Sequence, residues 1–558
     1  MALRLLSLPI SYCQTRLTLK HGNAVQEHPS NISITKNIHC IARAETIEPT
    51  AKHQANFWDY DYMMSLGSDY TDETQNVRVQ ELKEHVKHLL DELDEPLAKL
   101  ELIDAIERLG VGNHFEEEIL DILQIISVDR RVMEDLYSTA LRFRLLRKHG
   151  YDVPQEIFKS FQDEMGNFKS CLTLDTEGML SLYEASYLGF EGDNIMDEAK
   201  CFTTKHLKNP KEYINPTLAK RVEHSLELAL HLRLPTVEAR WYIYIYGSEE
   251  NMTPALLQLA ILNYNMVQGV HQKEIGTVAR WWMGLGLQNL SFLRDRMMMN
   301  FFWSMAIICE PKFGHFREEL TKVTMLLTVI DDMYETHGSL EELDLFTDAV
   351  ERWNVSAMEQ LPQHMKLCYM ALLNTNNNIG YQWVKLCKAY FMEAKWVQQR
   401  YTPTTKEYFD NGIQSIAVPL TMINCYFLTA KTITEEALER VELIDSLIYL
   451  PSMILRLGDD LITSTDEQNR GSKQCYMDEL GVSEEGAREH IRQLICDNWK
   501  KMNKARVSHH PFSEPFTSAT TNLCRIAECF SLLSHGQVDP NASLENLMST
   551  IFEPISLM

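Results

Sequence analysis

Apolar residues recur at intervals of three and four along most of the chain from about residue 45 onward, with charged residues between them. The N-terminal half shows this pattern most clearly in residues 77–93, 98–108, 115–126 and 132–148. This spacing places the apolar side chains on one face of an α-helix. The segments end where Gly or Pro occurs, as at Gly110, Gly150 and Pro154. Nothing alternates with a period of two for long enough to indicate a sheet, so the sequence predicts an all-α protein.

The chain is too long for one hydrophobic core. It has 558 residues, whereas single cores stop growing at roughly 250–300 residues. The segment GSEENMTP, residues 247–254, interrupts two strongly helical stretches. We therefore predict an N-terminal helical domain over residues 46–252 and a C-terminal helical domain over residues 253–558.

Composition narrows the function classes. The formal net charge of −25 argues against a nucleic-acid partner, whose phosphates would be repelled. No run reaches the roughly 18 uncharged apolar residues that a membrane span requires. The 12 cysteines form no C-x-x-C pair, which is typical of reduced thiols in a non-oxidising compartment.

Residues 1–45 differ from the rest of the chain. Up to Ala44 they contain one acidic residue, Glu27, and five basic residues, which are Arg4, Arg16, Lys20, Lys36 and Arg43. Ser and Thr are frequent, and no compact apolar segment ends in a small-residue cleavage site. This pattern favours an organelle transit peptide over a secretory signal. A disordered N-terminal tail is the alternative.

Three carboxylates end the apolar helical segment TMLLTVIDDMYETHG. Asp331 and Glu335 are one turn apart on one helix face, and Asp332 lies beside them. The helix dipole disfavours carboxylates at a C-terminal end, so three of them together indicate a bound cation. A solvated helix end is the alternative interpretation, because Asp pairs are common there.

A second acidic cluster lies in LRLGDDLITSTDEQNRG. Asp459, Thr463 and Glu467 follow at i, i+4 and i+8 and stack over two turns of one helix face. Carboxylate and hydroxyl oxygens are hard ligands that suit octahedral Mg²⁺. Such a spacing also arises by chance, so its weight comes from its combination with the other motifs.

The segment FLRDRMMMNFFW supplies a third element. Arg294 and Arg296 can grip a diphosphate through bidentate hydrogen bonds. Phe301, Phe302 and Trp303 can face a cation through their π-systems. Alone, these residues would more often be a surface arginine pair beside a core aromatic stripe. Together with the acidic motifs they predict metal-assisted heterolysis of a diphosphate ester.

These motifs resemble those of plant class I terpene synthases. DDMYE resembles the aspartate-rich motif with Glu in place of the usual final Asp, DDLITSTDE matches the second metal motif, and RDR matches the arginine motif. The similarity extends over residues 57–554 and is strongest to angiosperm monoterpene synthases. It implies a non-catalytic N-terminal α-barrel and a catalytic C-terminal bundle. The N-terminal half has no D-x-D-D, so protonation-initiated chemistry is not expected.

The resemblance also implies roles for the matching residues. The expected metal ligands are Asp331, Glu335, Asp459, Thr463 and Glu467. The expected diphosphate-binding residues are Arg294, Arg296, Arg456 and Lys473, and the expected catalytic residues are Asp331, Asp332 and Trp303, with Trp303 lining the cavity. The implied cofactor is Mg²⁺, with Mn²⁺ as the alternative. The implied partner is a small prenyl diphosphate, bound by a monomer or weak homodimer in the plastid (chloroplast stroma).

The sequence departs from the family pattern at several positions. Most monoterpene cyclases of this group carry two adjacent arginines ten residues before the N-terminal Trp, which corresponds to Trp58. Glu48 and Pro49 occupy those positions here. The tandem arginine is associated with isomerisation before ring closure, so its absence favours an acyclic product such as myrcene, ocimene or linalool.

Two segments are shorter than in the family. About four helical turns are missing between Tyr381 and Trp383. The loop that begins at Arg470 is shortened, and Lys473 is the candidate for the lysine that contacts diphosphate. A tyrosine usual near the last helix is replaced by Leu533.

Three alternatives remain open. The losses near Tyr381 and Arg470 are consistent with an inactive or crippled homologue. A sesquiterpene synthase that uses farnesyl diphosphate is the second alternative, and the transit-like N-terminus argues against it. The third alternative is a chain-elongating prenyltransferase, which also uses Mg²⁺ on acidic helices. Both of its clusters are Asp-rich, whereas the second cluster here is Asp-x-x-x-Thr-x-x-x-Glu.

Overall fold

The computed structural model describes residues 59–67, 73–129, 135–208, 215–375, 380–462, 471–534 and 547–556. Across these residues the regular structure consists of helices, with no strand and one isolated antiparallel bridge between Gln162 and Phe168. This confirms the predicted all-α class.

The described residues up to Tyr246 form nine α-helices. They are α1 (Tyr60–Ser65), α2 (Glu73–Glu92), α3 (Pro96–Arg108), α4 (Glu116–Val128), α5 (Leu136–Lys148), α6 (Thr176–Ser186), α7 (Asn194–Leu207), α8 (Pro216–Glu227) and α9 (Pro235–Tyr246). Local sequence explains several of their starts. Pro occupies the first turn of α3, α8 and α9, where its missing N–H costs nothing. The Asp135 carboxylate caps α5 by accepting from the Ser138 N–H.

The second half forms a bundle around α10. Its helices are α10 (Pro254–Leu285), α11 (Met297–Ile307), α12 (Gly314–Asp332), α13 (Leu340–Arg352), α14 (Gln363–Thr375), α15 (Gly380–Gln399), α16 (Thr405–Ser415), α17 (Val418–Thr429), α18 (Glu435–Glu442), α19 (Ser446–Ile462), α20 (Ser472–Leu480), α21 (Glu484–Val507) and α22 (Phe516–Ser534). The four helical segments predicted in the N-terminal half correspond to α2–α5. Of the last one, residues 132–134 lie outside the described residues.

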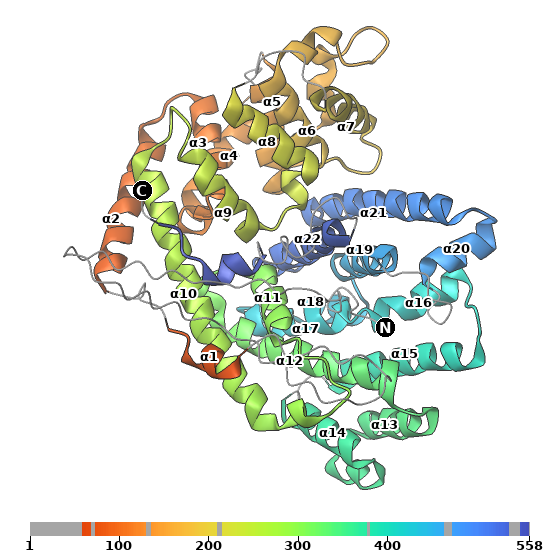
Figure 1. Ribbon diagram of the computed structural model, residues 1–558. Coiled ribbons are helices and arrows are strands. Elements are labelled where there is room, and N and C mark those ends of the chain that lie inside the picture. The colour runs from red at the N-terminus through yellow and green to blue at the C-terminus, as the bar shows by residue number, and fades with distance from the viewer. Residues whose placement is uncertain are drawn as a thin grey trace, which may run out of the picture.

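Helix α10 belongs to two hydrophobic cores. Figure 1 shows it running down one side of the molecule, with α3–α9 above and the bundle α11–α22 beside its lower part. Its first turns, from Leu256 to Leu262, pack in an N-terminal core with α2–α5 and α9. Its later residues, from Ile275 to Trp282, pack in a C-terminal core with α11–α15, α17–α19, α21 and α22.

The two ends of the described chain cross between these cores. Met63 of α1 is fully buried in the C-terminal core. Ile555, near the C-terminus, is buried in the N-terminal core. The predicted break at residues 247–254 falls between α9 and α10, although contacts from both chain ends join the two halves.

One stretch of the described residues, Thr405–Thr429, is long and apolar enough to span a membrane by composition. In this fold 78% of its most apolar window is buried, as in a core helix of a globular bundle. The structure divides it into α16 and α17, and Ala417 between them has a positive φ of 63°. All ten cysteines among the described residues are free thiols.

Candidate functional site

The first acidic motif lies where α12 changes form. The α-helix ends at Asp332 and continues as a π-helical turn, η9 (Met333–His337). One carboxylate oxygen from each of Asp331, Asp332 and Glu335 lies within 4.8 Å of the others. Asp331 and Asp332 are buried, and carboxylates so close together are costly unless cations balance them. Hard oxygen donors at this spacing fit a divalent ion such as Mg²⁺.

The arginine loop, residues 290–296 before α11, is tied to this cluster. Arg294 Nε donates to Asp332 Oδ1 at 2.6 Å, and Nη2 donates to the same oxygen and to Glu335 Oε2, the latter at 2.9 Å. The Arg294 backbone N–H donates to Asp332 Oδ2 at 2.9 Å. Burial lowers the pKa of Arg294, but Asp332 and Glu335 outweigh it and the net shift is upward. Burial raises the pKa of Asp332, although both arginines oppose the shift.

Arg296, the second arginine of the loop, has two terminal guanidinium nitrogens with unsatisfied hydrogen-bond donors. Its side chain is buried, and neither Nη1 nor Nη2 has a hydrogen-bond partner among the described residues. Nη2 lies 3.9 Å from Asp332 Oδ1. Burial lowers the pKa of Arg296, and Arg294 lowers it further. Unsatisfied buried guanidinium donors are costly, and an oxyanion such as diphosphate would satisfy them.

The second acidic motif lies at the end of α19. Asp459 and Asp460 are buried, and Arg456 Nη2 donates to Asp459 Oδ2 at 3.1 Å and to Asp460 Oδ1 at 2.8 Å. The Tyr408 hydroxyl also donates to Asp460 Oδ1, at 2.7 Å. These donors orient Asp460, and they place Arg456 beside both carboxylates. Thr463 and Glu467 lie outside the described residues, so their roles remain predictions.

Lys473 lies in the first turn of α20, close to the second motif. It is buried, and burial lowers the pKa of its ammonium group while the carboxylate of Asp460 opposes that shift. The neighbouring Ser472 backbone N–H donates to Asp460 Oδ2 at 3.2 Å. The short loop after Arg470 therefore still brings a lysine to the acidic end of α19.

Helix α15 carries a carboxylate that the sequence analysis missed. Glu393 is buried, and its Oε1 accepts from Ser415 Oγ at 2.5 Å and from Asn411 Nδ2 at 3.3 Å. Its Oε2 is buried with no hydrogen-bond partner in the described chain. The signal in the sequence is a Glu three residues after Tyr390 and seven after Leu386, on the apolar face of the helix.

Glu393 and Tyr390 lie between the two acidic motifs. After burial, the carboxylates of Asp331 and Glu393 are the main causes that raise the pKa of Tyr390. Burial lowers the pKa of Arg456, but nearby groups that include the carboxylates of Asp460, Asp459 and Glu393 outweigh it, and the net shift is upward. The Tyr390 hydroxyl is itself buried, with no hydrogen-bond partner among residues the structure describes. Helix α15 therefore presents two unsatisfied polar groups between α12 and α19.

A small, mostly apolar cavity lies below the motifs, among α11, α12, α17, α19 and α22. Its volume is about 20 Å³. Leu327 of α12 and Leu455 of α19 line it, four residues before Asp331 and Asp459 respectively. A four-residue separation keeps each pair on one helix face, so each motif begins one helical turn beyond a residue that lines this cavity.

Trp303 lines the cavity, as the resemblance implied. Its indole stacks on Phe530 with ring centroids 5.8 Å apart. Phe301 and Phe302 do not line it: Phe301 faces His271 and Phe302 meets Phe530 edge-on. Of the three aromatics proposed to face a cation, Trp303 is therefore the one in position.

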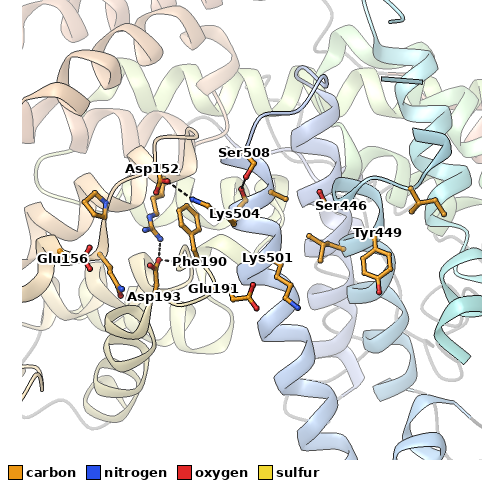
Figure 2. A pocket seen from close by; sticks show the side chains of 16 residues that line it. Asp152, Glu156, Phe190, Glu191, Asp193, Ser446, Tyr449, Lys501, Lys504 and Ser508 are labelled. Carbon is orange, nitrogen blue, oxygen red and sulfur yellow. Dashed lines mark hydrogen bonds and ion pairs between the residues drawn. The ribbon is translucent and has the colours of Figure 1, made fainter. Parts of the chain in front are cut away.

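Larger cavities also occur among the described residues. One of 830 Å³ lies between the two halves of the molecule, where Arg147 pairs with Asp193 and Lys504 with Asp152 (Figure 2). No residue of the three motifs lines it, and four of the charged residues that do line it form these two ion pairs. Another, of 390 Å³, adjoins the first motif and is lined in part by Glu335, Tyr390 and Glu393.

Two family models match the chain. Residues 57–226 match the terpene synthase N-terminal domain, and residues 322–501 match the terpene synthase family 2 C-terminal metal-binding domain. The second match includes both acidic motifs. The chain belongs to the terpene synthase family.

Its relatives include monoterpene synthases. The chain is 43% identical to a (-)-alpha-terpineol synthase of Vitis vinifera, with 100% of this chain and 99% of the relative covered. It is also 43% identical to a chloroplastic myrcene synthase of Quercus ilex, with both chains fully covered. Its structure is similar to that of isoprene synthase from grey poplar (Populus x canescens) in complex with three Mg²⁺ ions and dimethylallyl-S-thiolodiphosphate. That similarity has a TM-score of 0.83 and 39% identity over 90% of this chain and 99% of the other.

Proposed function

We propose that this chain is a monoterpene synthase, a carbon–oxygen lyase that ionises geranyl diphosphate with Mg²⁺, or with Mn²⁺ as the alternative ion. The observation that carries the proposal is the close placement of three carboxylates, within 4.8 Å of one another, beside the buried and unsatisfied guanidinium of Arg296. The first group fits a divalent ion and the second fits its diphosphate. The prenyl diphosphate analogue and Mg²⁺ bound to the grey poplar relative support the same pairing.

Each motif has a proposed part in the reaction. Bound Mg²⁺ would stabilise the charge that develops on the diphosphate. Asp331 and Glu335 hold metal on one side, with Asp332 fixing Arg294, and Asp459, Thr463 and Glu467 hold metal on the other. The diphosphate-binding residues are Arg294, Arg296, Arg456 and Lys473.

The chemistry is a heterolysis followed by quenching of a cation. The C1–O bond breaks, and its electron pair leaves on the diphosphate oxygen. The allylic cation then loses a proton to give an olefin or takes up water to give an alcohol. The Trp303 indole lines the apolar cavity that shelters the cation. We assign this chemistry to residues 253–558 and a non-catalytic role to residues 46–252.

The product is proposed to be acyclic, as myrcene, ocimene or linalool. Glu48 and Pro49, which stand where most cyclases of this group carry paired arginines, are the reason; both lie outside the described residues. The cavity of about 20 Å³ must enlarge to hold a ten-carbon chain, because sites for small molecules typically measure about 300 Å³ or more.

The test is product analysis. The full chain is incubated with geranyl diphosphate and Mg²⁺, with and without EDTA, and volatiles are separated by gas chromatography. An acyclic product that EDTA abolishes supports the proposal, whereas a cyclic product contradicts the argument from Glu48 and Pro49. A product from farnesyl diphosphate alone would make the chain a sesquiterpene synthase. A folded protein that is inert with both substrates is the crippled homologue that the short connection before Trp383 would explain.

The proposed location is the plastid. Chloroplastic names among the relatives, such as that of the Quercus ilex myrcene synthase, support it, together with the basic, Ser- and Thr-rich composition of residues 1–45. A fluorescent protein carrying residues 1–58 at its N-terminus should accumulate in chloroplasts of transfected leaf cells. Diffuse cytosolic fluorescence would contradict the proposal.

A further inference from the structure

Asp295, the middle residue of the arginine motif, points away from the acidic cluster and toward α1. Its Oδ1 accepts a hydrogen bond from the Tyr60 hydroxyl at 2.9 Å, across 235 positions of sequence. The same oxygen accepts from the Met297 backbone N–H at 3.3 Å. Its Oδ2 is buried and has no hydrogen-bond partner among the described residues, and burial raises the pKa of this carboxyl group. Within the described chain Tyr60 is thus the only side chain that donates to Asp295.

The neighbours of Asp295 point the other way. Arg294 donates to Asp332 and Glu335, and Arg296 lies 3.9 Å from Asp332. Three consecutive residues of a non-helical loop therefore contact two different parts of the molecule. Fixing the outward-facing carboxylate of Asp295 also fixes the backbone from which both guanidinium groups extend, and supporting contacts of this kind hold binding groups in productive geometry.

Tyr60 is suited to this task because α1 is anchored on both sides. Asp59 caps the helix by accepting from the Asp61 and Tyr62 N–H groups. Met63 is fully buried in the C-terminal core, and Arg280 of α10 donates to the Met64 carbonyl at 3.3 Å. Figure 1 shows α1 lying across the lower part of α10. Burial and the charge of Asp295 raise the pKa of Tyr60, so the phenol stays protonated and remains the donor.

We propose that Tyr60 is a positioning residue of the diphosphate site, which acts on Arg294 and Arg296 through Asp295. The proposal rests on the proposed function, since it takes the arginine motif to be the diphosphate-binding element. It means that a helix near the start of the N-terminal domain, α1, completes the site of the C-terminal bundle.

The experiment compares two single-hydroxyl deletions on one helix. Tyr60→Phe removes the donor to Asp295. Tyr62→Phe is the matched control, because its half-buried phenol has no hydrogen bond among those described. Binding of inorganic pyrophosphate in the presence of Mg²⁺ is measured by isothermal titration calorimetry on the full chain, well below the Tm of each variant, alongside steady-state kinetics with geranyl diphosphate.

We expect Tyr60→Phe to weaken pyrophosphate binding about tenfold, the effect of losing one hydrogen bond to a charged group, and to raise KM in parallel. Tyr62→Phe should match the wild type. A double-mutant cycle with Asp295→Asn should be non-additive, because Tyr60 acts through that carboxylate.

The outcomes separate this inference from the proposed function. Equal pyrophosphate affinity for Tyr60→Phe and Tyr62→Phe, or additive effects of Tyr60→Phe and Asp295→Asn, would overturn it. Tyr60-dependent pyrophosphate binding in a protein that turns over no prenyl diphosphate would support it and refute the proposed function. A wild-type chain that does not bind pyrophosphate with Mg²⁺ would refute both.

Discussion

Arg296 and Glu393 are single residues whose buried charges the fold keeps at a cost. Arg296 has two unsatisfied terminal nitrogens, and Glu393 has one unsatisfied oxygen. Buried unpaired charges ordinarily destabilise a protein, and replacing them with neutral side chains of similar size often stabilises it. Residues that bind ligands commonly show this conflict between stability and function.

Replacing Arg296 with Met should therefore separate stability from activity. We expect Arg296→Met to raise the free energy of unfolding by about 1 kcal/mol and to lower kcat/KM by about a hundredfold, from the loss of a charge-assisted contact of about 3 kcal/mol. Urea denaturation and steady-state kinetics measure the two effects. Arg352→Met, at an exposed position on α13, is the control and should change neither. Retained activity with lowered stability would show that Arg296 is a structural residue.

Glu393→Gln should act on the metal. The substitution removes the negative charge that lies between the two acidic motifs and keeps the shape of the side chain. We expect the Mg²⁺ concentration for half-maximal activity to rise about 10- to 100-fold, as when groups that support metal ligands are changed, with the Tm unchanged or higher. A Mg²⁺ titration of activity measures this. The surface substitution Glu436→Gln should leave the titration curve as in the wild type, and an unchanged curve for Glu393→Gln would exclude it from the site.

Among single residues, the sequence predicted those whose role follows from local spacing. Asp331, Asp332 and Glu335 lie together because they occupy one helix end, whereas Arg456 was indicated by the family resemblance and not by its spacing from Asp459. Glu393 could not be assigned this way, since its neighbours Ser415 and Asn411 come from another helix. The Tyr60–Asp295 contact joins residues 235 positions apart, and no local pattern encodes such a pairing.

At the scale of elements, the helices were predictable and their irregularities were not. The three-four spacing located α2–α5 to within a few residues, because burial of one helix face sets that spacing. The π-helical turn η9 had no local signal: its wider turn is selected by the packing of Met333 and Tyr334, both buried, rather than by propensity. Turns of this kind are frequent at functional sites.

The region of the Tyr381–Trp383 junction, where the sequence is shorter than the family pattern, can be tested at the neighbouring Gly380. Gly380 begins α15, and a Cβ there would lie 2.8 Å from the indole carbons of Trp353, which ends α13 with a φ of 46°. We expect Gly380→Ala to destabilise the protein by about 1–3 kcal/mol through overpacking. The control is Gly284→Ala in the last turn of α10, where a Cβ meets nothing within 4 Å, and it should stabilise by about 0.5–1 kcal/mol. Thermal unfolding that shows no difference between the two would mean that α15 does not start against Trp353.

At the scale of the whole molecule, the two halves are joined more firmly than the 830 Å³ cavity between them suggests. Asn503 of α21 is buried at this junction. Its Nδ2 donates to the Tyr187 and Gly189 carbonyls at 2.9 and 3.1 Å, and its Oδ1 lies 2.8 Å from His231 Nε2. Through these buried hydrogen bonds, Asn503 links the C-terminal half to the N-terminal half.

Asn503→Leu should therefore cost about 2–4 kcal/mol, because it leaves the Tyr187 and Gly189 carbonyls, between α6 and α7, and the His231 ring, between α8 and α9, without this partner. Lys504→Ala, next to it, should cost no more than about 0.5 kcal/mol, because the exposed pair with Asp152 is a surface ion pair. Differential scanning calorimetry measures both. Equal losses for the two variants would contradict the assignment of Asn503 as the main polar link.

The burial of Met63 in the C-terminal core has a consequence for how the molecule is made. Helix α1 is the first of the described helices to leave the ribosome. The core that receives it also includes Phe552, which is translated after all the labelled helices. The N-terminal core takes every buried member except Ile555 from residues 82–262, so it can form while synthesis continues. The C-terminal core is then completed last. This happens after its final residues have left the ribosome or, if residues 1–45 direct import, inside the organelle. Until the C-terminal core assembles, α1 has no place to dock.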